Sequence, residues 1–354
     1  MKTILIYSDC SFFGGSENVI PVLLKDKELN KIFRFVFIFN YNKEYLKGLN
    51  YKIDVSEHEI EGVRYVYADF IKNFLRKIKL GRLSLIFEIP LMIIDVWIQM
   101  PRFKAINPEL IFINNGGYPG ARTCRSAVFT AQLIGIKNIL FMVNNIAVPY
   151  STLRRIIQKP VDYLINNIVS SFMTASNYAK NALLNVLKIK ENKVILALNT
   201  FEKKEVTLKK NELKEQLGIV HDTFVIGSVG ELAKRKGHHV LINAIQLLIK
   251  KHNINIKLLI IGDGSEKKTL QKEINNNGLS NNILMISFTD NIFNYYNIMD
   301  LYTHPTIAAD DLPFAVREAM SIGLPIVASN YAGIPEIVQH GYNGMLVEPN
   351  HPEK

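Results

Sequence analysis

Cysteine is scarce in this sequence, with only Cys10 and Cys124 among 354 residues. Two thiols cannot form the disulfide framework that holds small secreted domains together, and they suit a reducing compartment. The apolar run in the N-terminal stretch MKTILIYSDC is too short for a signal peptide, and no cleavage site follows it. We therefore expect a cytoplasmic protein with ordinary apolar cores, which a hydrophobic content of 48% can build.

Several sequence signatures of other protein classes are also missing. No repeat of 20–50 residues and no low-complexity tract occurs, which argues against a solenoid or a disordered chain. The six-residue glycine fingerprint of dinucleotide-binding proteins is absent, so a hydride-transferring enzyme is disfavoured. A nucleic-acid binder is the least favoured class, because no surface motif combines aromatic and basic residues.

Positive charge is concentrated in the first part of the chain. Residues 1–200 contain 26 Lys and Arg against 15 Asp and Glu, whereas residues 201–354 contain 16 against 17. Such a one-sided field attracts polyanions, either nucleic acid or an anionic membrane surface. The length of the chain allows two domains, so the excess charge belongs to the first of them.

The segment 71–104 favours the membrane among these partners. A long apolar run follows its basic opening, but Glu88 and Asp95 make that run a poor spanning helix. Two interpretations stay open: an interfacial segment peripheral to the inner face of the cytoplasmic membrane, or a core helix with a solvated basic face. The opening contains no acid and five cations, which are Lys72, Arg76, Lys77, Lys79 and Arg82.

Apolar strand patterns alternate with helical patterns along the whole chain, for example the helical pattern at 237–252. Several runs are continuously apolar, which is typical of parallel strands buried on both faces. The pattern predicts an α/β protein with parallel sheets. The expected strands are Thr3–Tyr7, Phe33–Phe39, Leu110–Asn114, Ile139–Val143, Phe224–Val229, Lys257–Ile261, Leu301–His304 and Pro325–Ala328.

The best domain boundary lies near residue 200. We predict an N-terminal domain over 1–200, a charged linker over 201–222 and a C-terminal domain over 223–354. Ligands of open parallel sheets bind outside the carboxyl ends of the strands. Two such domains would therefore present their loops to a cleft between them.

Glycine-rich and basic loops follow the expected strands of both domains. Gly14 and Gly15 follow the first strand, where adjacent glycines let backbone amides approach a ligand, although a plain turn explains them equally well. The loop 230–237 offers Lys234, Arg235 and Lys236, which suit a diphosphate or simply form a solvated basic turn. Gly262 and Gly264 permit a tight turn against which a flat base could lie, although this signal is weak alone.

A pair of acids and a later glutamate follow the strand that ends at His304. Asp310 or Asp311 would be a good N-cap, and Pro313 suits the first helical turn. A cap does not explain Glu318, which lies about 7 Å along the helix axis from Pro313. That distance matches a nucleoside, so exposed amides would hold a diphosphate or sugar while Glu318 accepts hydrogen bonds from a ribose.

Taken in order, these motifs resemble family 4 retaining glycosyltransferases of the GT-B fold, with the strongest match from Val229 to Pro349. The stretches INNGGYPGARTCRSA and FMVNNIAVPYS look like a bacterial subgroup of that family. The motifs are GGSE (14–17), GELAKRKG (230–237), GDG (262–264), the acid-to-proline stretch 310–326, GIPE (333–336) and HGYNGMLVEP (340–349).

The resemblance implies two Rossmann-like domains that face each other across a cleft. It implies a donor, a UDP- or GDP-linked sugar, bound by the second domain and a glycan or lipid-linked acceptor bound by the first. The leaving phosphate would assist deprotonation of the attacking hydroxyl, so neither a protein nucleophile, a metal nor a further cofactor is expected.

The resemblance also implies site residues. Arg235 and Lys236 would hold the diphosphate and, with Asp310, form the catalytic set. Donor contacts would come from Gly230, Gly262, Gly264, Asp311, Leu312, Pro313, Phe314 and Glu318. An acceptor and diphosphate loop would contain Gly14, Gly15 and Glu17.

The sequence departs from the family pattern in four places. Glu231 stands where the family has Arg, so Arg235 would have to substitute for it. Asp310 replaces the usual Glu, and Asn144 stands where the family often has His. The chain ends at EPNHPEK, where the family begins its last helices, so we expect a truncated C-terminal domain.

The leading hypothesis is glycosyl transfer in the biosynthesis of a cell-envelope polysaccharide or lipopolysaccharide. A sugar-nucleotide epimerase of the same fold is the alternative enzyme, and it would turn over the donor without an acceptor. A catalytically silent nucleotide-sugar-binding module is the third reading, and Glu231 favours it.

Overall fold

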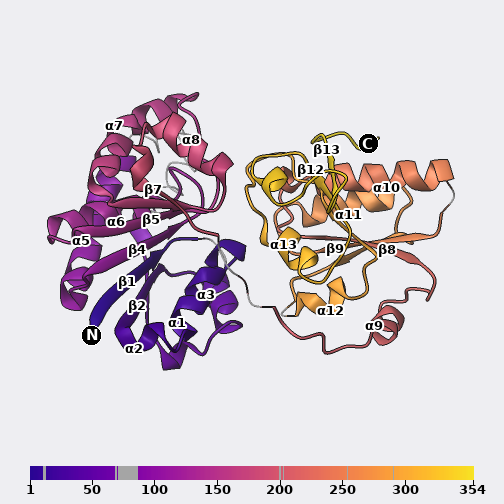
Figure 1. The fold of residues 1–354 in the computed structure, drawn as a ribbon, viewed down its shortest axis with the longest axis horizontal. Helices are drawn as coiled ribbons and strands as arrows, with labels where there is room; N and C mark the ends of the chain where they lie inside the picture. Colours follow the sequence, from indigo (N-terminus) through magenta and orange to yellow (C-terminus); the bar gives the residue numbers. More distant parts are fainter. Residues whose placement is uncertain are drawn as a thin grey trace. The chain divides into compact units, whose positions relative to one another are not determined.

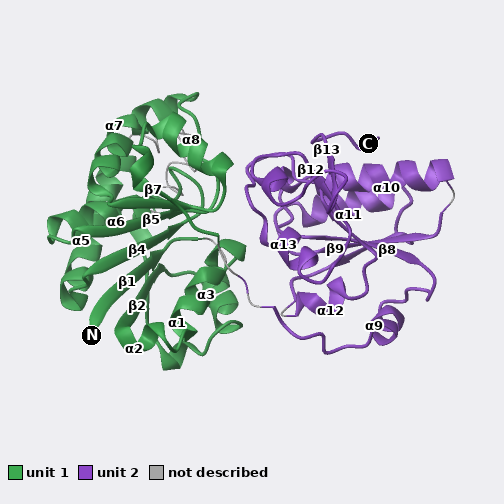
Figure 2. Ribbon diagram, viewed as in Figure 1, with its two compact units in different colours: residues 1–200 green, residues 201–354 purple. Residues whose placement is uncertain are grey.

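The computed structural model describes residues 1–10, 13–67, 70, 87–198, 201, 203–252, 254–289 and 291–354. The chain forms two compact units, residues 1–200 and residues 201–354, which Figure 2 shows in green and purple. The division falls where the balance of charge changes in the sequence.

Unit 1 is built on a parallel sheet, which in the described residues has the order β3-β2-β1-β4-β5-β6-β7 (Figure 1). The chain runs from β1 outward to β3 and then returns to the other side of β1, so the topological switch lies between β1 and β4. The strands are β1 Lys2–Ser8, β2 Phe33–Asn40, β3 Glu59–Val63, β4 Leu110–Asn115, β5 Asn138–Val143, β6 Ser171–Thr174 and β7 Val194–Leu196.

Helices cover both faces of this sheet. One apolar core lies between the sheet and α5 to α8, and a second contains side chains of α1 and α3. The helices are α1 Val19–Lys25, α2 Leu29–Ile32, α3 Lys43–Asn50, α5 Glu88–Ile106, α6 Arg122–Leu133, α7 Leu153–Ile168 and α8 Asn177–Leu187.

Unit 2 repeats this plan with a parallel sheet of order β10-β9-β8-β11-β12-β13 in the described residues. Its switch point lies between β8 and β11, where ligand-binding loops gather in open parallel sheets. The strands are β8 Phe224–Val229, β9 Ile256–Ile261, β10 Ile283–Ile286, β11 Leu301–His304, β12 Ile326–Ser329 and β13 Met345–Val347.

Two helical layers again enclose the sheet of unit 2. One core contains side chains of α9, α12 and α13, and the other contains side chains of α10 and α11. The helices are α9 Lys210–Gln216, α10 His238–His252, α11 Lys267–Asn276, α12 Ile292–Tyr296 and α13 Phe314–Met320.

The predicted α/β class and the eight expected strands are confirmed, most of them to within one residue. The segment 201–222 is not simply a linker, because it contains α9 and buries Leu213 and Ile219 in the core of unit 2. Of the predicted membrane segment, residues 71–86 lie outside the described residues. Within the part that the structure describes, no helix is long and apolar enough to cross a bilayer.

Candidate functional site

The loop that follows β8 carries the predicted basic residues. Lys234, Arg235 and Lys236 form a single 3-10 turn that ends at Gly237. Gly237 has a φ of +70°, and a Cβ there would lie 2.0 Å from the carbonyl oxygen of Pro305. The basic loop therefore packs directly on the start of the loop that follows β11, and only glycine permits that approach.

Gly262 and Gly264 also serve close packing between loops. A Cβ on Gly262 would lie 2.0 Å from the carbonyl oxygen of Gly230, and one on Gly264 would lie 2.5 Å from that of Leu232. The Leu232 amide donates to the Asp263 carbonyl at 2.9 Å, which ties the loops after β8 and β9 together. These predicted donor-binding glycines thus bring the ends of β8 and β9 into one cluster of backbone, which Gly237 joins to the loop after β11.

Asp310 lies at the centre of this cluster and is 7% exposed. Its Oδ2 accepts hydrogen bonds from Lys236 Nζ at 2.5 Å and from His304 Nε2 at 2.8 Å. The prediction that Asp310 or Asp311 caps the helix is wrong, because the N-cap of α13 is Pro313 and no side chain caps it. Asp310 points instead toward the cations of the neighbouring loop.

Electrostatics keep Asp310 ionised. Burial alone would raise the pKa of Asp310, but Lys236 and His304 hold it well below its usual range. Burial lowers the pKa of His304 despite the attraction of Asp310, so the imidazole is neutral at neutral pH. A neutral imidazole that donates from Nε2 accepts at Nδ1, and Tyr302 lies 3.4 Å from that nitrogen.

Arg235 has two partners within the site. Its Nη2 donates to Glu231 at 2.6 Å, and its Nη1 donates to the carbonyl oxygen of Ala309 at 2.9 Å. The side chains of Arg235 and Glu231 are 35% and 28% exposed, so the pair stands at the surface of the loop cluster. Glu231 therefore neutralises the cation that was expected to replace the family arginine.

Glu318 lies on α13 and accepts a hydrogen bond from Tyr296 of α12 at 2.9 Å. The ring of Tyr296 packs edge-on against Tyr302 of β11, with 5.8 Å between the ring centroids. A chain of contacts thus runs from Glu318 through two tyrosines to His304 and Asp310. The predicted residues Leu312 and Phe314 lie in the same segment, Leu312 buried and Phe314 under the Arg317 guanidinium at 4.5 Å.

In unit 1 the predicted loop contains Gly14 and Gly15, which begin a short 3-10 turn after β1. Glu17 is fully buried, so its side chain holds this loop in place and does not reach out to a ligand. It accepts from Ser8 Oγ at 2.7 Å and Asn114 Nδ2 at 2.8 Å, and also from Tyr45 and Cys10.

Sequence reasoning missed the polar neighbours of both loops. His304 was named only as the end of a strand, and Tyr296 carried no motif at all. Asn144 donates to Asn114 Oδ1 at 2.8 Å and to the Asn115 carbonyl at 2.9 Å, so it belongs to the network beside Glu17. Asn114 and His304 could have been identified from their positions, because each is a polar residue near the carboxyl end of a strand, β4 and β11 respectively.

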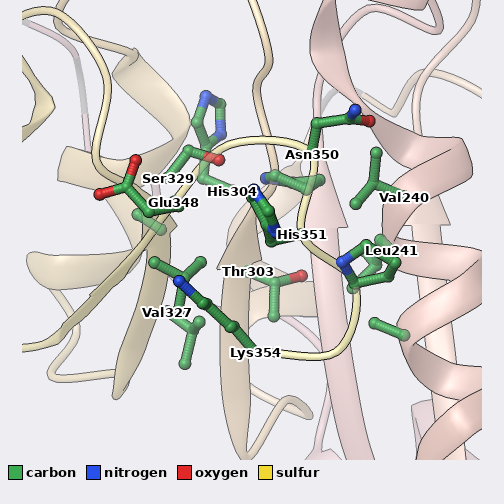
Figure 3. Close-up of a pocket in the computed structure, with 15 residues that line it drawn as sticks. Val240, Leu241, Thr303, His304, Val327, Ser329, Glu348, Asn350, His351 and Lys354 are labelled. Atoms are coloured by element: carbon green, nitrogen blue, oxygen red, sulfur yellow. The ribbon is translucent and has the colours of Figure 1, made fainter.

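A separate hollow lies on the α10 face of the unit 2 sheet (Figure 3). Val240 and Leu241 of α10, Thr303 of β11 and Val327 of β12 line it, and the segment after β13 closes it. Of its lining residues, only His304 and Pro305 belong to the strand ends and loops described above. Its largely aliphatic wall suits apolar contact and not a diphosphate.

The comparisons with known proteins point to one class. Residues 209–354 match the family model for glycosyl transferases group 1. The capsular polysaccharide biosynthesis glycosyltransferase CapM of Staphylococcus aureus is 26% identical over 199 residues, 52% of this chain and 51% of CapM. The amylovoran biosynthesis glycosyltransferase AmsK of Erwinia amylovora is 32% identical over 134 residues, 36% of this chain and 33% of AmsK. The chain spans about half the length of the first curated relatives it matches.

Solved structures show the same architecture. The crystal structure of HepE from Anabaena, in complex with UDP and glucose, matches with a TM-score of 0.76 and 21% identity. The match covers 100% of this chain and 87% of HepE. The predicted GT-B class is thereby confirmed for the two parallel-sheet units. Among the residues that the structure describes, no cluster of three or more His, Cys, Asp or Glu could hold a metal ion.

Proposed function

We propose that this protein is a retaining glycosyltransferase of the family 4 type. It transfers a sugar from a nucleotide-diphosphate sugar to a cell-envelope glycan or lipid-linked acceptor at the inner face of the cytoplasmic membrane. The observation that carries the proposal is the arrangement of Lys236, Asp310 and His304 at the switch point of unit 2. The family match of residues 209–354 and the names of the relatives support the transferase class.

Lys236 and Arg235 would bind the donor diphosphate. Lys236 gives one of its three donors to Asp310, so two N–H groups remain for phosphate oxygens. During transfer the bond from the anomeric carbon to the phosphate oxygen breaks, and negative charge grows on the departing phosphate. Cations fixed beside that oxygen stabilise the transition state more than the ground state, without a metal ion.

Asp310 and the amides of Asp311 to Phe314 would hold the donor sugar, and Glu318 would accept from the ribose hydroxyls. Gly14 and Gly15 would lie beside the diphosphate and the acceptor. The new bond forms from the acceptor oxygen to the anomeric carbon, and the acceptor proton passes to the leaving phosphate. HepE was solved with UDP and glucose, which favours a UDP-linked donor here over a GDP-linked one.

A panel of UDP- and GDP-sugars tested by thermal shift examines the donor assignment without an acceptor, since ligand binding to the native state raises the melting temperature. One donor should raise it, and Glu318→Ala should abolish that shift. Glu212→Ala, an exposed acid on α9, is the control and should keep the shift. A donor-induced shift in Glu318→Ala equal to that of the wild type would disprove the ribose role. No change in melting temperature with any UDP- or GDP-sugar would disprove the donor class.

Metal independence is tested in the same assay series. Transfer to an envelope acceptor extract should proceed at an unchanged rate after EDTA treatment, since Lys236 and Arg235 supply the positive charge. Loss of transfer with EDTA, and its recovery with Mg²⁺ or Mn²⁺, would contradict this part of the proposal.

The Arg235–Glu231 ion pair favours a second candidate, a silent nucleotide-sugar-binding module. Glu231 engages the cation that the diphosphate would otherwise use. In that case a donor would bind but no acceptor would receive sugar, and Glu231→Arg would create activity. Robust transfer by the wild-type chain would exclude this candidate.

A further inference from the structure

Helix α5 carries apolar side chains on its exposed side as well as on its buried side, where Leu91, Val96 and Phe103 pack. Its two acids, Glu88 and Asp95, face the protein interior and are buried. Its outward positions carry Ile93 and Trp97, which are 56% and 71% exposed. A surface helix normally keeps its outward side polar, so the exposed apolar side chains and the buried acids of α5 require a separate explanation.

Helix α7 also combines buried polar side chains with exposed apolar ones. It buries Arg155, Gln158 and Asp162 beside Ile165, whereas Leu153 and Ile156 are 70% and 54% exposed. The helix is amphipathic, but its apolar face points away from the sheet. Two helices of one layer therefore share exposed apolar side chains and buried acids, which a single exceptional residue does not explain.

Ion pairs fix both helices in this orientation. Arg125 of α6 pairs with Glu88, and Gln158 of α7 donates to the same carboxylate at 2.6 Å. Arg155 and Asp162 pair within α7 at 2.9 Å. Turning either helix to hide its apolar face would expose these partners and leave their buried counterparts unpaired, at a large cost in free energy.

The two apolar faces form one surface. A hollow between the helices is lined by Ile89 and Met92 of α5 and by Ile157 and Val161 of α7. α5 and α7 both pack on α6, on one side of the unit 1 sheet (Figure 1). We call this surface the α5–α7 face; its most exposed apolar side chains are Ile89, Ile93, Trp97, Leu153, Ile156 and Tyr163.

The charges on the α5–α7 face have one sign. All three acids of α5 and α7 are buried, whereas Lys104, Arg154 and Lys159 are exposed. Trp97 and Tyr163 add aromatic rings with a polar edge, which prefer the boundary between hydrocarbon and water. Exposed apolar side chains bordered by cations and interfacial aromatics match the chemistry of an anionic bilayer surface.

We propose that the α5–α7 face docks unit 1 on an anionic lipid bilayer. A second copy of this chain fits less well, because a two-fold interface on this face would bring its cations together with no exposed acid of either helix to oppose them. The proposal goes beyond glycosyl transfer, since it holds whatever donor or acceptor unit 2 serves. It would keep a lipid-linked acceptor within reach of the enzyme.

Vesicle co-sedimentation of the full chain tests the proposal. Phosphatidylcholine vesicles with 30% phosphatidylglycerol should retain the protein, and pure phosphatidylcholine vesicles or high salt should retain far less. The variant Ile93→Gln/Trp97→Gln/Ile156→Gln should lower the partition coefficient by about tenfold or more. The control variant Ile32→Gln/Val220→Gln/Tyr342→Gln changes equally exposed side chains elsewhere and should bind as the wild type does.

The cations are tested separately by the variant Lys104→Gln/Arg154→Gln/Lys159→Gln. Each lost cation should lower binding to the anionic vesicles by about fivefold at most and leave the weak binding to neutral vesicles unchanged. Failure of the wild type to bind anionic vesicles would overturn the proposal, as would wild-type binding by the apolar triple variant. So would a lipid-free dimer that this variant abolishes, because the face would then be a self-association surface.

Failure of this proposal is distinguishable from failure of the proposed function. The apolar triple variant should keep the full donor-induced thermal shift, because its substitutions lie in unit 1 at exposed positions. Vesicle binding without any donor shift would leave the membrane face intact and remove the glycosyltransferase proposal alone.

Discussion

Helices α7 and α10 show the same helical periodicity and opposite burial. In α10 the apolar residues Leu241, Ile242 and Ile245 pack on the sheet, and lysines occupy its last turn. In α7 three of the four buried residues are polar, namely Arg155, Gln158 and Asp162, and the fourth is Ile165. Periodicity therefore establishes that a helix has two different faces, whereas the partners available in the next layer decide which face is buried.

The buried charged pairs of the two units also differ, in the elements that they connect. In unit 1, Glu88 and Arg125 join helices α5 and α6 within one layer. In unit 2, Asp310 and Lys236 join two loops at the carboxyl ends of strands. The first pair should therefore govern folding and the second should govern catalysis.

The largest expected effect is on the stability of unit 1. Glu88→Leu leaves Arg125, which is 1% exposed, without its carboxylate, and should cost about 3–5 kcal/mol in the free energy of unfolding. The double variant Glu88→Leu/Arg125→Met removes both charges and should recover most of that loss. Urea unfolding followed by circular dichroism measures both.

The exposed pair Arg34 and Glu59 is the matched control in the same unit. Glu59→Gln should change stability by less than about 1 kcal/mol, because surface pairs contribute little. A double variant no more stable than Glu88→Leu would show that the pair is not the source of the effect.

Asp310→Asn should have the next largest effect, and on turnover. Removing the carboxylate charge releases Lys236 and would weaken the proposed contact to the donor sugar, so kcat/KM should fall by about 100-fold or more. Steady-state transfer measures it, with Asp222→Asn, an exposed acid, as the control. Unchanged kcat/KM in Asp310→Asn would contradict the contrast between the two units. So would a decrease in kcat/KM per folded molecule in Glu88→Leu that equals the decrease in Asp310→Asn.

Gly237→Ala should destabilise unit 2 by about 2–4 kcal/mol, because it combines a positive φ with a clash against Pro305. Gly278→Ala has nearly the same φ, +68°, but nothing within 4 Å of the added Cβ. It should cost only about 1 kcal/mol. Thermal unfolding of both variants separates backbone strain from the loop contact, and equal losses would show that the contact is unimportant.

The smallest expected effect is a dependence of stability on pH. Burial, aided by the positive charge of Lys236, lowers the pKa of His238 from 6.5 to about 3. The unfolded chain therefore binds a proton between these values that the folded chain does not, so stability falls as pH drops below 6.5. The loss should reach about 2 kcal/mol at pH 5.

His238→Asn removes this titration. Its free energy of unfolding should change less between pH 7 and pH 5 than that of the wild type, measured in urea at both values. An identical pH dependence in the two proteins would show that His238 does not titrate as its burial implies.

Much of the fold was predictable from the sequence, because parallel strands buried on both faces appear in the sequence as continuous apolar runs. The run ILFMV at 139–143 could be identified directly as a strand. Short strands such as β7 and β13 were missed, since three residues carry too little pattern. The linker was misread because the charged helix α9 contributes only Leu213 to the core.

The candidate site was less predictable than the fold. Arg235, Lys236, Asp310 and Glu318 were identified from motif spacing, and the structure brings them into one group of loops and helices in unit 2. The orientation of Asp310 was not predictable, because it depends on His304 and Lys236 from separate strands. The exposed apolar faces of α5 and α7 were not predictable for the same reason, because the buried acids depend on partners from separate helices.

Glu17 sets a limit on how the first glycine loop can move. Its carboxylate accepts from β1 through Ser8, from α3 through Tyr45 and from β4 through Asn114. A hinge motion of this loop alone would break all three connections together and leave the Glu17 carboxyl group without its hydrogen-bond donors. Any opening motion during a reaction cycle must therefore carry these elements as one body, and the pivot has to lie elsewhere in the chain.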